Sequence, residues 1–141
     1  MKKIIALVIS MMMLLLAVGC GGGDEKKADG DKKITMGFSQ IGAESEWRTA
    51  NTESVKEAAK AAGIDLQFSD AQQKQENQIK AIRSFIAQGV DVIALVPIVE
   101  TGWDTVLKEA KDAKIPVIIV DRDLKVEDDS LYVAKIGTNM I

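Results

Sequence analysis

The sequence predicts an α/β fold in which helices cover both faces of a doubly wound parallel sheet. From Ile34 onward, short apolar runs alternate with segments whose apolar residues recur at helical spacing. Two of the later apolar runs, residues 90–96 and 115–120, are almost continuous Val, Ile, Ala and Leu, which is typical of strands covered on both faces. Strands that alternate with helices in this way form right-handed βαβ units around a parallel sheet.

The first half of this region contains two expected strands and one helix. Residues 34–39 form a short apolar strand, and residues 64–68 alternate apolar with polar side chains, as in a half-buried strand. Gly63 is a plausible stop for the helix between them. The apolar stripe of that helix is expected to contain Trp47, Ala50, Ser54, Val55, Ala58, Ala59 and Ala62.

The second half continues the alternation. A helix that carries Ile79, Ile82, Phe85 and Ile86 is expected to end at Gly89, before the strand at residues 90–96. A further helical stripe consists of Trp103, Val106, Leu107 and Ala110. Pro116 lies among the first residues of the strand at 115–120, where it is tolerated, and residues 132–136 predict a fifth strand.

Composition excludes several functional classes. The 141 residues suffice for one compact domain, and 47% hydrophobic with 28% charged residues indicates a globular chain. The net charge of -3 argues against a nucleic-acid partner. There is no histidine, and the single cysteine cannot form an internal disulfide or a multi-cysteine metal site. We therefore expect no enzyme, no cofactor and no metal site.

The N-terminus is typical of an exported lipoprotein. Lys2 and Lys3 precede an apolar run at residues 4–18, which predicts a signal peptide over residues 1–19. The stretch Leu16-Ala17-Val18-Gly19-Cys20 resembles a bacterial lipobox, so Cys20 is expected to be lipidated. Residues 21–33 lack large apolar side chains and predict a flexible tether, giving a lipidated cysteine and tether over 20–33. A buried cysteine or an uncleaved membrane anchor is the alternative.

The sequence resembles two enzyme motifs but departs from each at a position that the motif requires. The stretch "GFSQIG" at residues 37–42 has Ser39 where a dinucleotide fingerprint needs its middle glycine. Gly42 also stands three residues after Ser39, rather than the two of a nucleophile elbow. The strand ends contain no nucleophile–base pair either, which favours a binding module.

Ligands of such a sheet bind outside the carboxyl ends of its strands. Glu44, Trp47 and Arg48 follow the first strand, and Asp121 and Arg122 follow the fourth. We expect these groups to meet at neighbouring strand ends, where guanidinium and carboxylate groups suit sugar hydroxyls and an aromatic ring suits a sugar C–H face. The alternatives are a core role for Trp47, a helix-dipole role for Glu44 and a solvated turn at Asp121-Arg122.

At these residues the sequence resembles the N-terminal lobe of type I periplasmic binding proteins, the sugar receptors of ABC transporters. The stretches "GFSQIGAESEWRTA", "DAQQKQENQIKAIRSFIAQGVDVIALVPIVETGW" and "LKEAKDAKIPVIIVDRDL" carry the resemblance, which is strongest to the galactofuranose-binding branch. It implies that residues 44–48 form one wall of a sugar site and that Asp121-Arg122 binds hydroxyls. Val96-Pro97 replaces the Asn-Pro usual in ribose receptors, which argues against ribose.

The resemblance also implies a function and a domain boundary. Residues 34–141 are expected to be an incomplete N-terminal lobe, truncated before the second lobe. The implied role is to bind a monosaccharide and deliver it to ABC permease subunits. The implied location is the outer face of the cytoplasmic membrane, through the lipid anchor, or the periplasm. A lipid-anchored sugar sensor or chemoreceptor subunit is the alternative.

Overall fold

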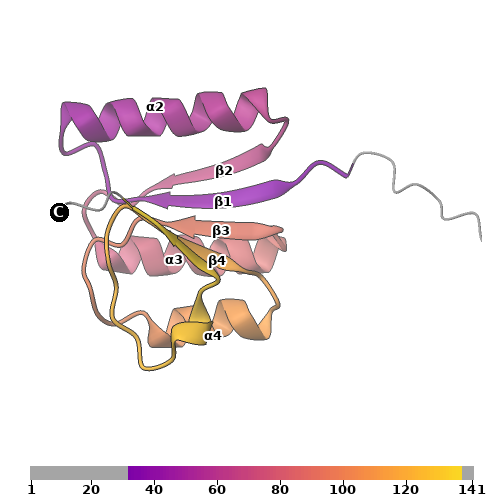
Figure 1. Ribbon diagram of the computed structural model, residues 1–141, viewed down its shortest axis with the longest axis vertical. Coiled ribbons are helices and arrows are strands. Elements are labelled where there is room, and N and C mark those ends of the chain that lie inside the picture. Colours follow the sequence, from indigo (N-terminus) through magenta and orange to yellow (C-terminus); the bar gives the residue numbers. More distant parts are fainter. Residues whose placement is uncertain (1–31, 138–141) are drawn as a thin grey trace, which may run out of the picture. The chain divides into compact units, whose positions relative to one another are not determined.

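The computed structural model describes residues 32–137, which build a five-stranded parallel sheet with helices on both faces (Figure 1). The α/β fold expected from the sequence is confirmed. The elements are, in order, β1 (Thr35–Gln40), α2 (Glu46–Ala61), β2 (Asp65–Asp70), α3 (Gln75–Gln88), β3 (Val92–Leu95), α4 (Asp104–Asp112), β4 (Val117–Val120), the short 3-10 helix η1 (Asp129–Leu131) and β5 (Ala134–Ile136).

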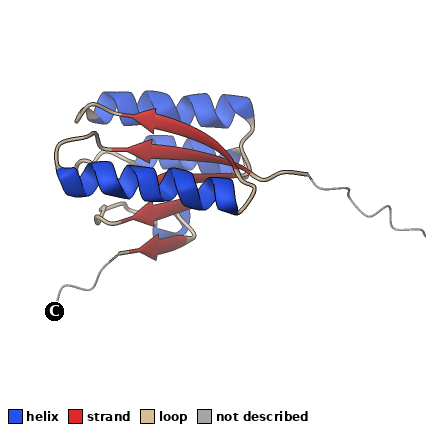
Figure 2. Cartoon of the chain, turned by 90° about the horizontal axis from the view of Figure 1, so that it is seen from above, coloured by secondary structure: helices blue, strands red, loops and turns tan. Residues whose placement is uncertain are grey.

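The strands lie in the order β2-β1-β3-β4-β5, and every neighbouring pair is parallel. In Figure 2 the strand arrows accordingly point the same way. After β1 the chain adds β2 on one side and then β3 on the other, so the strand order reverses between β1 and β3. A ligand crevice forms at such a reversal, beyond the carboxyl ends of the strands. The segment after β1, residues 41–45, lies at that edge.

Most of the core lies on one face of the sheet. Helix α2 covers the other face, while α3 and α4 lie together below the sheet in Figure 1. The larger cluster, between the sheet and α3 and α4, includes Ile82, Phe85, Ile93, Leu95, Trp103, Leu107 and Ile119. Gly37 of β1 packs directly against α3, because a Cβ there would approach the Phe85 ring to 2.5 Å. Close helix–sheet packing therefore explains this glycine of the "GFSQIG" stretch.

The helices begin and end at the residues that the sequence suggested, within a few positions. Ser45 caps α2, since its side chain accepts a hydrogen bond from the Arg48 backbone N–H at 3.1 Å. Gly89 ends α3 with a left-handed backbone (φ 66°), which glycine adopts without steric cost. Gly63 plays the same part just after α2, with φ 69°.

The buried line of α2 differs from the expected stripe. Arg48, Val55 and Ala59 face the sheet, whereas Trp47 is 57% exposed and Ala50, Ser54, Ala58 and Ala62 are also exposed. The apolar residues of this helix are mostly alanine, which marks a buried face weakly. In the structure, the buried face of α2 instead contains the charged Arg48.

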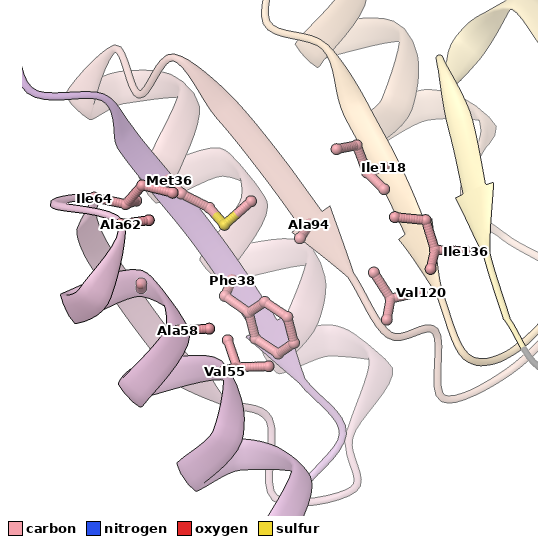
Figure 3. Close-up of a pocket in the computed structure, with 11 residues that line it drawn as sticks. Met36, Phe38, Val55, Ala58, Ala62, Ile64, Ala94, Ile118, Val120 and Ile136 are labelled. Atoms are coloured by element: carbon pink, nitrogen blue, oxygen red, sulfur yellow. The ribbon is translucent and has the colours of Figure 1, made fainter.

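Strand β3 is buried on both faces as predicted, but β4 is not. Val117 and Ile119 are each 1% exposed, whereas Ile118 and Val120 are only half-buried. The latter two point into an open apolar groove of about 340 Å³, which α2 flanks on its other side (Figure 3). The prediction of a fully buried β4 was therefore wrong for one of its two faces.

The expected signal peptide and the lipidated Cys20 lie outside the described residues. Of the expected tether, only Lys32 and Lys33 are described, and the Lys32 ammonium lies 2.9 Å from the Asp91 carboxylate. From Lys32 to Gly137, the helices are all too short or too polar to cross a bilayer.

The adjacent isoleucines of β4 test this difference between the two faces. Ile119→Ala removes a side chain from the close-packed core and should lower the free energy of unfolding by about 2–5 kcal/mol. Ile118→Ala removes a half-buried side chain and should cost about 1 kcal/mol. Urea unfolding of both variants measures the two values. Equal costs would mean that the groove face is covered in solution.

Candidate ligand-binding site

Arg48 is the centre of the predicted site. It lies in the first turn of α2 and is only 3% exposed. Its Nε donates to Glu44 Oε1 at 3.1 Å, and its Nη2 donates to Asp121 Oδ2 at 2.9 Å. The two carboxylate side chains are about a quarter exposed, at 24% and 25%. One guanidinium therefore holds together the segments that follow β1 and β4.

These two segments do not follow neighbouring strands, so the expectation of adjacent strand ends was wrong. Strand β3 lies between β1 and β4 in the sheet. The Arg48–Asp121 ion pair consequently joins segments that lie on either side of β3. The sequence could not have given this, because the strand order depends on how the βαβ units are wound.

The backbone at Asp121 explains how its carboxylate reaches Arg48. Asp121 has φ 67°, a left-handed conformation that is uncommon for residues other than glycine but is enriched in Asp and Asn. Its N–H donates to Ile136 O at 2.7 Å, and the Arg122 N–H donates to Val120 O at 2.8 Å. The chain thus turns sharply as it leaves β4. Residues in sparsely populated backbone conformations often cluster at active sites and ligand-binding sites.

Trp47 lies at the surface of the site. Because it is 57% exposed, the alternative of a core role is wrong, and Trp103, which is fully buried, is the core tryptophan. The Arg48 Cζ atom lies 4.7 Å from the centre of the Trp47 ring, a cation–π geometry. Part of the indole therefore contacts Arg48 while much of its surface is open to solvent.

Glu44 and Arg122 have different surroundings at this edge. Glu44 binds Arg48 directly, so it does more than complement the helix dipole. Arg122 is exposed, and within residues 32–137 its side chain forms no hydrogen bond or ion pair. Asp121 and Arg122, expected to act as a pair, therefore face different surroundings: the carboxylate binds Arg48 and the guanidinium lies in solvent.

The cluster of Arg48, Glu44 and Asp121 retains one unused donor and carries one excess negative charge. Arg48 Nη1 is buried and has no hydrogen-bond partner among the described residues, although an unpaired buried donor costs about 1–3 kcal/mol. Arg48 contributes one positive charge, whereas Glu44 and Asp121 contribute two negative charges. The Arg48 guanidinium is thus already neutralised by protein groups, and its remaining Nη1 suits an uncharged oxygen.

Buried glutamines also shape this edge, and the sequence analysis did not identify them. Gln40, at the end of β1, has no exposed surface. Its Nε2 lies 3.0 Å from Asn51 Oδ1 and 3.1 Å from Thr52 Oγ1, while its Oε1 accepts from the Ile41 N–H at 3.0 Å. This side chain joins the second turn of α2 to the end of β1. A glutamine at a strand end resembles an ordinary loop residue in sequence, so no pattern marked it.

The part of the chain that the structure describes holds no group of three acidic, histidine or cysteine side chains arranged for a metal ion. The residues that meet at this edge can offer hydrogen bonds and an aromatic surface to a ligand.

Breaking the Arg48 ion pairs should destabilise the fold more than breaking a surface pair. Arg48→Lys keeps the charge but cannot reach both carboxylates with a planar fork, so we expect a loss of about 1–3 kcal/mol in unfolding free energy. Arg83→Lys is the matched control, because Arg83 binds Glu109 through two bonds of 2.8 Å but is 53% exposed. The Arg83→Lys variant should lose less than about 1 kcal/mol of unfolding free energy. Comparable losses measured by denaturant unfolding would contradict a central role for Arg48.

Comparison with known proteins gives a consistent assignment. Residues 36–140 match the family described as "Periplasmic binding protein domain". The galactofuranose-binding protein of Escherichia coli (strain K12) is 56% identical over 108 residues, covering 77% of this chain and 34% of that protein. The fructose import binding protein of Bifidobacterium longum is 38% identical over 144 residues, covering 99% of this chain and 44% of that protein.

Solved structures agree with these relatives. The periplasmic binding component of the arabinose ABC transporter from Shewanella sp. ANA-3, bound to α- and β-L-arabinofuranose, superposes with a TM-score of 0.75 at 67% identity, over 75% of this chain and 35% of that one. A Mycobacterium smegmatis protein in complex with β-D-fucofuranose superposes with a TM-score of 0.74 at 59% identity, over 75% of this chain and 35% of that one.

The matched region thus spans roughly a third to less than half of each of these proteins, at 34%, 44%, 35% and 35% of their lengths. The family match itself extends from β1 to the last residues of the chain. On this basis the chain belongs to the periplasmic binding protein family and has the α/β architecture of its N-terminal lobe.

Proposed function

We propose that this chain is part of the substrate-binding component of a sugar ABC importer. It binds a neutral monosaccharide at the carboxyl edge of its sheet, without converting it, and delivers it to membrane permease subunits. The observation that carries this proposal is the exposed Trp47 beside the buried Arg48, whose Nη1 has no partner. An aromatic surface next to fixed polar groups suits the apolar face and hydroxyls of a sugar ring.

The charges at the site favour an uncharged ligand. Glu44 and Asp121 already neutralise Arg48, so an acidic sugar would find no unpaired buried cation among the described residues at this edge. The remaining cation of the predicted site, Arg122, lies in solvent, where ion pairs are weak. A hydroxyl oxygen can accept from Arg48 Nη1 if the Trp47 side chain moves to admit it, and Arg122 offers a further donor from solvent.

The relatives suggest which neutral sugars to test. The names of the proteins compared above include galactofuranose, arabinofuranose and fucofuranose, all of them five-membered rings. We therefore propose a furanose as the ligand class. The described residues contact only one side of such a ring, so we expect dissociation constants in the millimolar range, a free energy of about -4 kcal/mol.

Sugar binding is best measured through the two indole N–H groups by NMR. Methyl β-D-galactofuranoside should shift the Trp47 indole signal, because that ring lies at the site. It should not shift Trp103, whose indole N–H is bonded to Val99 O at 2.8 Å in the core. Trp47→Phe assigns the two signals.

Two further sugars serve as controls for the ligand class. The corresponding methyl galactopyranoside tests ring size, and galacturonate tests charge. Both should shift the Trp47 signal less at equal concentration. An unchanged Trp47 signal with every sugar would refute binding at this edge, and an equal response to galacturonate would refute the selection for neutral ligands.

The proposed lipid anchor at Cys20 accounts for how the domain would stay at the cell surface. After cleavage, a lipidated Cys20 and the polar residues that follow would hold the domain on the outer face of the cytoplasmic membrane or in the periplasm. Metabolic labelling with a fatty acid should mark the wild-type chain and not Cys20→Ser. Equal label on both would exclude this anchor.

A further inference from the structure

A second fully buried glutamine, Gln78 of α3, holds the loop that follows β3. Its Nε2 donates to Val96 O at 2.7 Å, and its Oε1 accepts from the Ile98 N–H at 3.0 Å. Both ends of the amide are therefore satisfied by backbone groups on either side of Pro97. No solvent reaches the side chain, which has 0% exposure.

The buried Gln78 side chain does more than fill space between α3 and the sheet. The other buried residues of α3 are Ala81, Ile82 and Phe85, all apolar. A buried amide without partners costs about 1–3 kcal/mol, so a glutamine in this row is tolerable only because both of its bonds are made. An apolar side chain of similar length would fill the same volume but leave Val96 O and the Ile98 N–H unpaired.

The loop that Gln78 holds is connected to the segment after β4. Gln75 Nε2 donates to Thr101 O at 2.7 Å, and Trp103 Nε1 donates to Val99 O at 2.8 Å. Glu100 O accepts from the Lys125 N–H at 2.6 Å. Lys125 ends the short segment that begins with Asp121 and Arg122. The loop after β3 is thus linked to the segment that carries Asp121 and Arg122 by this backbone bond and by an ion pair between the Lys125 and Glu100 side chains.

We propose that Gln78 is a positioning residue, which sets the loop after β3 and, through Glu100 and Lys125, the segment that carries Asp121 and Arg122. The link to sugar binding rests on the proposed function, but the positioning itself does not. Positioning by Gln78 makes the carboxyl edge of the sheet depend on α3, which lies on the opposite face of the sheet from α2.

Amide hydrogen exchange of the full chain, measured by NMR without sugar, tests this directly. Gln78→Met keeps the length of the side chain and removes both bonds. The Ile98 amide should then exchange roughly 10- to 100-fold faster, and the Lys125 amide should also lose protection. The Trp103 indole signal should shift, because its acceptor lies in the same loop.

Three comparisons separate positioning from general stability. The Ile93 amide, bonded to Pro116 O in the core at 3.0 Å, should change only as far as global stability changes. Gln40→Met removes an equally buried amide at β1 and should instead affect the Ile41 amide, whose N–H donates to Gln40 Oε1. Gln88→Met, at an exposed position of the same helix, should affect none of these amides.

The conservative variant decides the result if Gln78→Met does not fold. In Gln78→Glu, burial favours the neutral carboxylic acid, whose hydroxyl can donate to Val96 O and whose carbonyl oxygen can accept from the Ile98 N–H. Protection at Ile98 and Lys125 should therefore be preserved. The proposal would be overturned if exchange at Ile98 and Lys125 were unchanged in Gln78→Met, or if the Ile93 amide lost as much protection as they did. Loss of protection at Ile98 in Gln78→Glu would also overturn it. A missing sugar response in the wild-type chain would refute the proposed function alone, since the exchange is measured without ligand.

Discussion

The burial of one guanidinium governs the carboxyl edge of this lobe. Arg48 has 3% of its surface exposed, and a charge in such a position must be matched by carboxylates within hydrogen-bonding distance. Glu44 and Asp121 provide this, and to do so the segments after β1 and β4 must stay together on either side of β3. Successive helical residues point about 100° apart, so an inward Arg48 also directs Trp47 outward. The surface offered to a ligand therefore follows from the ion pair.

Side-chain amides extend this organisation to the loops. Gln40 joins the end of β1 to α2, and Gln78 joins α3 to the loop after β3, each with both ends of its amide bonded. Loops that carry binding residues are ordinarily the least stable parts of a fold. Here they are held by buried groups on regular elements, an arrangement that keeps a first set of contacts in place before a ligand arrives.

Much of the architecture was predictable because its causes are local. Apolar periodicity located the five strands and the three α-helices of residues 34–136 within a few positions, but not the 3-10 helix η1. Gly63 and Gly89 marked helix ends because each adopts a left-handed backbone. The edge at which to seek a site also followed, since parallel strands place all their carboxyl ends together. The weak point was α2, where alanines gave little contrast between the buried and exposed faces.

The sequence by itself determined the fold class, the order of elements and the set of residues, Glu44, Trp47, Arg48, Asp121 and Arg122, that lie near one edge. Only the tertiary structure decided their partners. Asp121 binds Arg48 rather than acting beside Arg122, Trp47 is exposed while Trp103 is buried, and one face of β4 lines a groove. The physical reason is that periodicity reports the environment of a residue along one element. Pairing of charges depends instead on strand order, on a single left-handed backbone at Asp121 and on which helix covers which strand.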